Sequence, residues 1–312
     1  MLYGIFLKEK KDVAQYLNFS GLAPQRVFHG RGGCFTDLEY VNIDWLCPVV
    51  LITLYERVCD EWLQALISSL SQLAPVEMRS IVVQRRHLAR VVFETVYGEQ
   101  VSRYAVREQG LDYQLDFSAG MHAGLFLDMA QARQWVRAQS AGKRVLNLFS
   151  YTCAFSVAAL AGDAVSVVNM DLSRPSLSRG RESHRLNHHD MERVAFYAHD
   201  IFKSWGKLKR LGPFDLVIVD PPSFQRGSFE LSKDYARVVR QLPALLAQEG
   251  NVLACLNDPS YGPEYLQNLF LECAPELKFQ QRLANPEAFA DRDEARALKV
   301  LRFQRSEMVL AG

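Results

Sequence analysis

The sequence predicts an α/β fold, a mostly parallel seven-stranded sheet covered by helices, preceded by a small α+β domain. In the second half of the chain, short runs rich in β-branched residues alternate with segments of helical spacing, which is the pattern of such a sheet. In the stretch Phe214–Phe224, Asp215 and Asp220 bracket an apolar run, as expected for a strand buried on both faces. Two prolines follow Asp220 and end this strand, because neither can donate to a ladder.

Composition limits the class of protein. At 312 residues the chain can hold two domains, and its 49% hydrophobic and 23% charged residues are typical of a soluble globular protein. No apolar run approaches a membrane span, and the first eleven residues lack the charge order of a secretory signal. Six scattered cysteines without a C-x-x-C pair predict free thiols in a reducing, cytoplasmic compartment, with no zinc site. The net charge of +1 favours neither the presence nor the absence of a nucleic-acid partner.

The first 118 residues are expected to form the small α+β domain. Residues 1 to about 38 carry little pattern, and Arg26–Gly33 has the turn formers and basic residues of a loop, either a solvated turn or a phosphate contact. Beyond Tyr40, β-rich runs predict strands over 49–55, 80–84, 90–96 and 113–117. Apolar residues at helical spacing predict a helix over 62–73.

A basic cluster lies within this first domain. Five residues in twelve positions are cationic or can become so: Arg79, Arg85, Arg86, His87 and Arg90. Most such runs only cover a solvated surface. Because predicted strands flank this one, a surface that contacts phosphates is the alternative interpretation.

The second domain, residues 119–312, alternates strands and helices. Seven strands are predicted, over 144–149, 165–170, 193–197, 216–219, 251–256, 276–283 and 297–303. Helices are predicted over 128–139, 155–160, 173–187, 235–247 and 265–273. Asp128 is expected to cap the first of these helices and Ser173 the third, which carries Pro175 in its first turn.

Acidic residues follow three successive strands. Asp171, Asp200 and Asp220 therefore meet at one edge of a parallel sheet, where ligands bind in open α/β folds. After the first strand, Ser150–Ala154 is a turn of small and polar residues whose backbone N–H groups can approach a ligand. Asp171 occupies the usual place of a carboxylate that binds two ribose hydroxyls. S-adenosylmethionine and the dinucleotides both present such a ribose, but the absence of a G-x-G-x-x-G motif counts against NAD or FAD.

The stretch Asp220-Pro-Pro-Ser-Phe224 has the composition of a substrate site. The carbonyl of Pro221 has no ladder partner and can accept a hydrogen bond from a substrate amine, and Phe224 offers a face for a planar ring. The alternative is an ordinary strand-to-loop connection with a structural aspartate.

Four motifs in the same order resemble class I S-adenosylmethionine-dependent methyltransferases, and most of all the bacterial 23S ribosomal RNA methyltransferases, which have a cytosine-C5 and a guanine-N7 branch. These motifs are Gly124-Leu-Phe-Leu-Asp128, Val145-Leu-Asn-Leu-Phe-Ser-Tyr-Thr152, Asp171-Leu-Ser173 and Asp220-Pro-Pro-Ser-Phe224. The resemblance covers roughly residues 26–305. It implies a Rossmann-like methyltransferase fold and S-adenosylmethionine as the cofactor.

The resemblance also implies roles for individual residues. The implied catalytic residues are Asp220, Pro221 and Phe224. The implied cofactor-binding residues are Phe126, Asp128, Asn147, Phe149, Ser150, Tyr151, Thr152, Asp171, Leu172, Ser173, Asp200, Ile201 and Asp220. No residue is implied as a metal ligand.

Two positions depart from the family pattern. Cys153 stands where the family has glycine, and because cysteine tolerates positive φ poorly, we expect a reshaped turn or a more weakly held cofactor. Met129 and Ala130 follow Asp128 where the family has His or Gln and then Arg, although Arg133 matches a later family arginine. These departures leave open a weakly active relative.

The chemistry of the target base is constrained by one position. Methylation of pyrimidine C5 needs a nucleophile that first adds to C6, and the cytosine branch uses a cysteine just after the fifth strand. Asn257 stands there in this chain, and Cys255 lies inside the apolar strand. We therefore predict methylation of RNA, of large-subunit ribosomal RNA at a purine nitrogen, with guanine N7 favoured over cytosine C5.

Two other functions remain compatible with the sequence. They are a protein or small-molecule N-methyltransferase with the same Asp-Pro-Pro site, and an RNA- or ribosome-binding relative without turnover. No membrane or metal partner is expected, and the sequence does not specify the oligomeric state or the target nucleotide.

Overall fold

The computed structural model describes residues 11–118, 121–225 and 228–305, so the segment compared with a secretory signal lies outside it except for Lys11. The chain forms two compact units. The N-terminal unit consists of Met1–Gly110, Gln114–Leu127 and Glu287–Glu294, and the C-terminal unit of Leu111–Tyr113, Asp128–Pro286 and Ala295–Gly312. The domain division at residues 118 and 119 stays a proposal. No helix among the described residues is long and apolar enough to cross a membrane.

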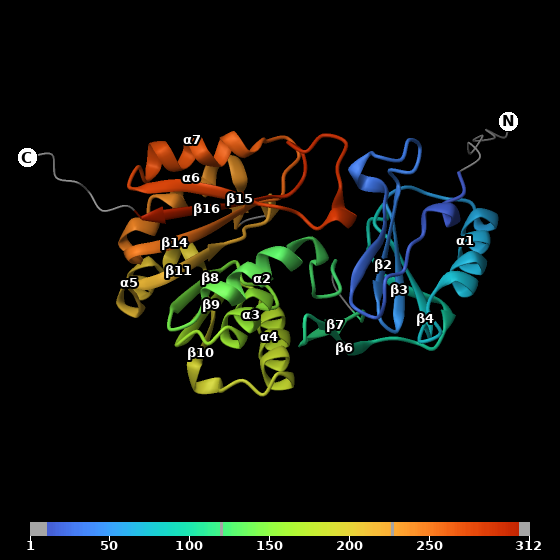
Figure 1. Cartoon of the computed structure of the whole chain (residues 1–312), viewed down its shortest axis with the longest axis horizontal. Coiled ribbons are helices and arrows are strands. Elements are labelled where there is room, and N and C mark those ends of the chain that lie inside the picture. Colours follow the sequence, from blue (N-terminus) through green and yellow to red (C-terminus); the bar gives the residue numbers. More distant parts are fainter. Residues whose placement is uncertain (1–10, 119–120, 226–227, 306–312) are drawn as a thin grey trace, which may run out of the picture. The chain divides into compact units, whose positions relative to one another are not determined.

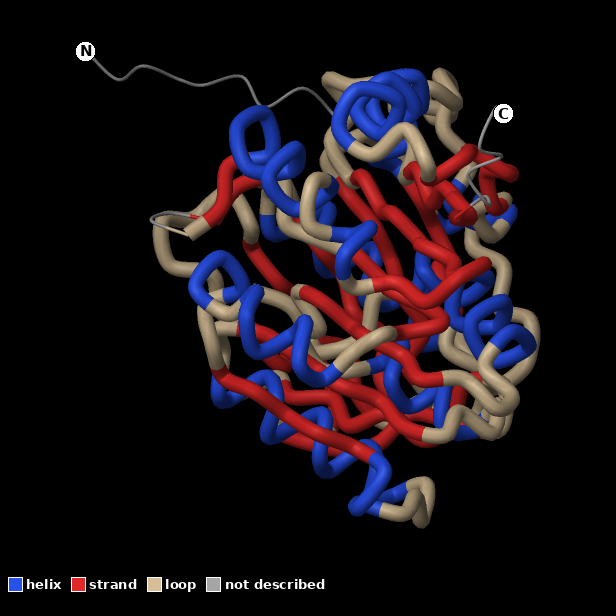
Figure 2. Tube along the Cα trace, turned by 90° about the vertical axis from the view of Figure 1, so that its left-hand side faces the viewer, coloured by secondary structure: helices blue, strands red, loops and turns tan. Residues whose placement is uncertain are grey.

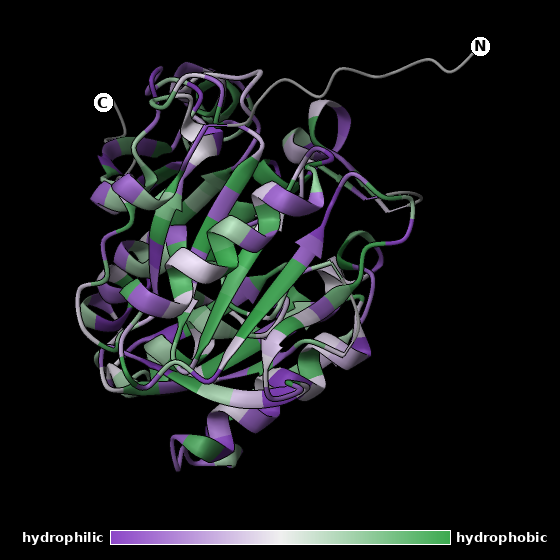
Figure 3. Ribbon diagram, turned by 90° about the vertical axis from the view of Figure 1, so that its right-hand side faces the viewer, coloured by the Kyte–Doolittle hydropathy of each residue, from purple (hydrophilic) through white to green (hydrophobic). Residues whose placement is uncertain are grey.

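The N-terminal unit contains a five-stranded sheet in the order β1-β2-β3-β4-β5. Its elements are β1 (Gln25–His29), β2 (Val41–Leu46), β3 (Val49–Leu54), α1 (Asp60–Leu73), β4 (Ser80–Arg85) and β5 (Phe93–Gly98). Only β3 and β4 pair in parallel, and α1 makes the connection between them. β2 and β3 are buried along their whole length, and the strands of this sheet are mostly green in the hydropathy colouring of Figure 3.

Two strands of this sheet, β1 and β2, were not predicted from the sequence. Arg26–Gly33 was expected to be a loop, but its first half belongs to β1 because Val27 and Phe28 are buried in the core of the unit. The predicted strand 90–96 begins only at Phe93. A hairpin follows, β6 (Arg103–Glu108) and β7 (Leu111–Asp116), whose two turn residues both have positive φ, as a tight hairpin requires.

The C-terminal unit contains the predicted seven-stranded sheet, in the order β10-β9-β8-β11-β14-β16-β15. Its strands are β8 (Arg144–Leu148), β9 (Ser166–Asp171), β10 (Val194–Ala198), β11 (Phe214–Val219), β14 (Leu246–Leu256), β15 (Leu277–Leu283) and β16 (Lys299–Arg305). β16 alone runs antiparallel to the rest: it pairs antiparallel with β14 and with β15, so β15 has the same direction as the first five strands. The mostly parallel α/β fold is therefore confirmed, and Figure 1 shows these strands side by side.

Helices cover this sheet. They are α2 (Ala130–Gln139), α3 (Ala154–Ala161), α4 (Arg174–Leu186), α5 (Trp205–Leu211), α6 (Leu231–Val239) and α7 (Pro263–Cys273). α3 packs on α2, α4, β8 and β9, whereas α7 packs on α6, β15 and β16. Figure 2 shows the strands of the unit in red among these helices in blue.

The strand order creates a topological switch point. From β8 the chain moves outward to β9 and β10, and it then returns to β11 on the other side of β8. The connections that leave β8 and β11 therefore diverge, and a crevice opens at their carboxyl ends.

Three helix predictions can be compared with the structure. Ser173 caps α4 as predicted, since its Oγ accepts from the backbone N of Ser176 at 3.2 Å. Asp128 is not an N-cap, because it already lies in a 3-10 turn and Met129 precedes α2. The helix expected over 235–247 is wrong in its second half: α6 ends at Val239, and Pro243, which cannot extend an α-helix, lies in a short 3-10 turn before β14.

Candidate active site

The turn after β8 holds three residues in an unusual conformation. Phe149, Tyr151 and Cys153 have φ of 56°, 45° and 60°, in the left-handed region that residues other than glycine rarely adopt. Hydrogen bonds to β9 hold the turn there: the N of Ser150 donates to the carbonyl of Met170 at 3.2 Å, and the N of Tyr151 donates to the side-chain carboxylate of Asp171 at 2.9 Å. Such strain costs about 1–3 kcal/mol per residue and concentrates at functional sites.

Cys153 adopts the left-handed conformation itself, so the reshaping expected at this residue does not occur there. Its side chain is fully buried at the start of α3, and burial raises the pKa of its thiol. Gly180 of α4 makes the space: a Cβ at position 180 would lie 2.6 Å from the sulfur of Cys153. A cysteine is therefore accommodated in the turn because the facing helix carries a glycine.

Asp171 ends β9 with its carboxylate already oriented. One oxygen accepts from the backbone N of Tyr151 at 2.9 Å and the other from the backbone N of Ser173 at 2.7 Å. Burial raises the pKa of this carboxyl, and the two backbone bonds oppose that rise. Since each carboxylate oxygen can accept two hydrogen bonds, Asp171 can still accept from two hydroxyl groups of a ligand.

A small pocket, of about 20 Å³, opens beside Asp171. It is lined by Phe149, Asp171, Leu172, Asp200, Ile201, Phe202, Gln225, Ser228 and Phe229. The first five of these residues are among the predicted cofactor-binding set. The other four were not predicted, although the aromatic Phe202 directly follows Ile201.

Aromatic side chains form much of this pocket. The ring of Phe229 meets that of Phe149 edge to face at 5.2 Å and is nearly parallel to that of Phe202 at 6.4 Å. The guanidinium of Arg237 lies 4.2 Å from the Phe202 ring. An apolar, partly aromatic wall next to one oriented carboxylate suits a ligand that joins a planar ring to a sugar.

Asp200, after β10, has a structural role as well as a place in the pocket. One carboxylate oxygen accepts from the backbone N of Phe202 at 2.9 Å, which caps the 3-10 turn Ile201–Lys203. The other lies 3.8 Å from Lys203. The cap orients Asp200 beside Ile201 and Phe202 at the pocket wall.

Asp220, after β11, lies in a different electrostatic environment. Burial first, and the charge of Asp128 second, raise its pKa to about 7, although Arg133 acts in the opposite direction. Arg133 is 2% exposed. The carboxyl end of β11 and the start of α2, with the 3-10 turn before it, thus bring together two carboxylates and one guanidinium. The proton occupancy of Asp220 changes near neutral pH.

The Pro-Pro segment is held in place after Asp220. Pro221 is buried, and the Oγ of Ser223 donates to the carbonyl of Asn257 at 2.8 Å. Phe224 begins a two-residue strand, β12 (Phe224–Gln225), that pairs with β13 (Phe229–Glu230), and its side chain is 68% exposed. The ring of Phe224 is therefore largely open to solvent among the described residues.

The end of β14 presents an amide. Cys255 is 1% exposed, and burial raises the pKa of its thiol far above the usual value. Asn257, two residues later, is exposed. The thiol of Cys255 is therefore not available to a base at this edge.

Several predicted residues lie outside the pocket lining. Asn147 is buried in β8, where its amide donates to Asn169 at 3.0 Å while its own oxygen has no hydrogen-bond partner among the described residues. Ser150 and Thr152 are buried in the turn, and the Tyr151 ring lies 5.4 Å from the Arg179 guanidinium. Phe126 belongs to the N-terminal unit, where it contacts the ring of His122.

Comparison with known proteins identifies related chains. The S-adenosylmethionine-dependent methyltransferase family matches residues 25–304. A Bacillus subtilis protein named "Putative ribosomal RNA large subunit methyltransferase YwbD" is 32% identical over 76% of this chain and 61% of its own length. The ribosomal RNA large subunit methyltransferase I of Aeromonas salmonicida is 32% identical over 54% of this chain and 43% of its own. The chain thus spans about half the length of these curated relatives.

Solved structures agree with this result. SMU.776, crystallised with SAH, has a TM-score of 0.83 and 28% identity, and the match covers 91% of this chain and 76% of that one. A tRNA m1G37 methyltransferase of M. jannaschii has a TM-score of 0.63 at 12% identity, over 85% of this chain and 74% of that one, which shows a shared fold alone.

Proposed function

Since the chain belongs to the S-adenosylmethionine-dependent methyltransferase family, with S-adenosylmethionine as its cofactor, we propose that it methylates large-subunit ribosomal RNA at a purine nitrogen. The observation that carries the choice of atom is the edge formed by β11 and β14, where the Oγ of Ser223 binds the carbonyl of the exposed Asn257 and the thiol of Cys255 is buried. The RNA substrate is supported by the names of the ribosomal RNA methyltransferases that the chain resembles.

The residues of the pocket fit this cofactor. Asp171 can accept from both ribose hydroxyls, and Phe149 and Phe229 give an apolar wall for the adenine. Asp128 and Asp220 add negative charge near the strand ends, which suits a sulfonium cation. When bound, S-adenosylmethionine supplies an electrophilic methyl group.

On the acceptor side, the chain positions the base and excludes water. A base must leave its stack to reach a buried reaction centre, and the exposed ring of Phe224 can stack on it. Asp220 and the carbonyl of Pro221 can accept hydrogen bonds from an exocyclic amine. Guanine N7 has an in-plane lone pair and no proton to lose, so alignment alone suffices for its methylation.

Transfer of labelled methyl groups tests the proposal. Purified protein is incubated with labelled cofactor and either total RNA or total protein from a strain that lacks this gene, and we expect label in the large-subunit RNA only. Label in protein, or in no fraction despite cofactor binding, would support one of the alternative functions. Mass mapping of ribosomal RNA from the deletion strain would identify the nucleotide. A covalent adduct between Cys255 and 5-fluorocytosine RNA would overturn the choice of a nitrogen.

A further inference from the structure

The register of the N-terminal sheet gathers distant segments at one end. His29 pairs with Asn42, Asn42 with Thr53, and Thr53 with Gln84, so the chain leaves β1, β3 and β4 at the same end. The residues just beyond these strands include Arg31, Tyr55 and Arg86. Arg31 and Arg86 come from two segments that lie far apart in the sequence, the glycine-rich stretch at 26–33 and the basic cluster at 79–90.

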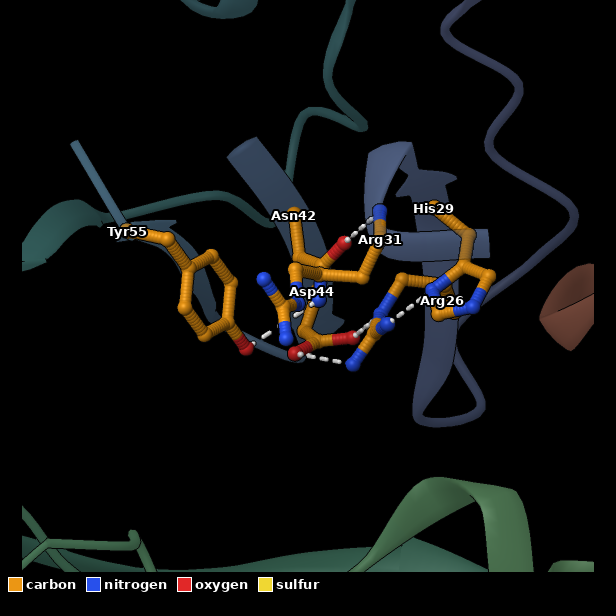
Figure 4. A network of polar contacts seen from close by, with 6 residues as sticks. All are labelled: Arg26, His29, Arg31, Asn42, Asp44 and Tyr55. Atoms are coloured by element: carbon orange, nitrogen blue, oxygen red, sulfur yellow. Dashed lines mark hydrogen bonds and ion pairs between the residues drawn. The ribbon is translucent and has the colours of Figure 1, made fainter. Parts of the chain in front are cut away.

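Tyr55 is the centre of this arrangement. Its hydroxyl accepts from the Asn42 amide at 3.3 Å, and the Asn42 oxygen accepts from the backbone N of Arg31 at 3.2 Å (Figure 4). The guanidinium carbon of Arg31 lies 4.5 Å from the centre of the Tyr55 ring, and that of Arg86 lies 5.9 Å from it. One aromatic ring therefore holds two guanidinium groups close together.

Other arginines nearby are already neutralised. Arg26 forms a two-point ion pair with Asp44, and both side chains are little exposed (Figure 4). Arg85 pairs with Glu94 at 3.1 Å. Within the described parts of the chain, by contrast, Arg31 and Arg86 have no carboxylate partner.

His29 contributes no charge to this group. Burial and, after it, the charges of Arg26 and Arg31 lower its pKa to about 3. It is therefore neutral at neutral pH, and its Nδ1 accepts from Arg26. The guanidinium groups of Arg31 and Arg86 remain, with donors that no carboxylate among the described residues uses.

We propose that Arg31 and Arg86 bind the phosphodiester backbone of the RNA substrate. The inference rests on the proposed function, because an RNA methyltransferase must hold its substrate outside the reaction centre. Guanidinium donors form a planar fork that matches two phosphate oxygens, and stacking on a ring fixes the plane of the fork in advance. Arg31 is exposed and Arg86 half-buried, so an extended polyanion can reach both.

Arg79 provides a matched control. It belongs to the same basic cluster in the sequence, but it precedes β4, whereas Arg86 follows the other end of that strand. Arg79 is exposed, as Arg31 is. Replacing it by alanine removes one positive charge from the same unit, as each half of the double variant does, without changing the group around Tyr55.

The test compares Arg31→Ala/Arg86→Ala with Arg79→Ala in the full chain. The probe is a labelled mixed-sequence single-stranded RNA, titrated at several salt concentrations, with thermal melting as a check on folding. The double variant should bind about tenfold more weakly than wild type, and the slope of log affinity against log salt should fall by about 0.7 for each phosphate that the variant no longer neutralises. Arg79→Ala should bind like wild type, and Arg31→Lys/Arg86→Lys should recover part of the affinity.

The remaining outcomes overturn the inference in different ways. Equal affinity of the double variant and wild type, with methyl transfer to RNA intact, would remove this site but leave the proposed function standing. Equal weakening in the double variant and in Arg79→Ala would show general attraction of a basic surface. Wild-type protein that neither binds nor methylates RNA would overturn the function and this site together.

Discussion

The carboxylates that end β9 and β11 occupy equivalent places in one sheet, but their surroundings differ. Asp171 accepts a backbone N–H on each oxygen, and these two bonds oppose the effect of burial on its pKa. Asp220 is half-buried near a second carboxylate, Asp128, and the guanidinium of Arg133, and its pKa is raised to about 7. Equal positions in the topology therefore give a fixed hydrogen-bond acceptor at one strand end and a group of variable protonation at the other.

From this difference we infer separate tasks for the two strand ends. A carboxylate fixed by two backbone donors suits ground-state binding of hydroxyls, which is a matter of affinity. A carboxylate among charges suits the region where charge changes as the methyl group moves. Mutations at the two ends should therefore separate cofactor binding from transfer.

The largest effect is expected for Asp220→Ala. Transfer to RNA should fall by about 10²–10³-fold, because a charged group at the reacting centre is lost, while affinity for S-adenosylhomocysteine should change much less. Single-turnover transfer and calorimetry measure the two quantities. Asp215→Ala is the matched control: this aspartate follows the first residue of the same strand and accepts from the backbone N of Arg144 at 2.8 Å. Equal losses of transfer and affinity in Asp220→Ala would contradict the division of tasks.

The second-largest effect is expected for Asp171, at the end of β9. Asp171→Ala should weaken cofactor binding by roughly 1.5–3 kcal/mol, the range for hydrogen bonds to a charged group, with transfer at saturating cofactor less affected. Asp190→Ala is the control, since Asp190, like Asp171, accepts from the backbone N two residues later, here at 2.9 Å, but lies outside the pocket lining. Unchanged affinity of Asp171→Ala in calorimetry would remove its ribose role.

Phe224→Ala tests the acceptor side of the β11 end. Base stacking on an aromatic ring is worth roughly 1–3 kcal/mol, so transfer should fall by about one to two powers of ten while cofactor affinity stays constant. Because the ring is 68% exposed, the melting temperature should hardly change. Phe279→Ala, at another partly exposed aromatic of the same unit, is the control. A loss of stability with proportionate loss of both functions would indicate packing instead.

The acidic residues at the strand ends could be predicted well from the sequence, whereas two of the aromatic residues that line the walls of the pocket could not. Asp171, Asp200 and Asp220 could be found because strand–helix alternation fixes which residues follow each parallel strand. Phe202 and Phe229 were missed because they join only when β13 folds back beside the end of β10, which no local pattern encodes.

The same limit explains why the group around Tyr55 in the N-terminal unit could not be predicted from the sequence. Arg31 and Arg86 lie far apart in sequence and meet on Tyr55 through the register of β1 to β4. Register depends on pairing between strands, and neither β1 nor β2 was predicted. The prediction that Asp128 caps a helix was wrong for a different reason. Composition alone does not distinguish an N-cap from a residue in a 3-10 turn just before the helix.

The contrast between the strand ends also predicts how stability depends on pH. The pKa of Asp220 in the folded protein, about 7, lies above the ordinary aspartate value, so folding favours the protonated form. Its contribution is fully present below the unfolded pKa and is lost as pH rises through about 7. The melting temperature of cofactor-free protein should therefore fall between about pH 5 and pH 8 by a larger amount in wild type than in Asp220→Asn. Parallel curves for the two proteins would show that Asp220 is not the group that titrates.

The smallest effect concerns the turn that presents the N of Tyr151 to Asp171. Gly180→Ala should destabilise the protein, because the new Cβ would lie 2.6 Å from the sulfur of Cys153. Cys153→Gly removes that sulfur and the strained φ, so Gly180→Ala should cost less in its presence, with a coupling of about 1 kcal/mol in the free energy of unfolding. Urea denaturation of the wild type, both single variants and the double variant measures it. The rescue should be partial, since the carbonyl of Thr152 still lies 3.1 Å from the new Cβ. Additive losses would mean that the turn and α4 adjust independently, and that Gly180 does not explain how a cysteine fits where the family has glycine.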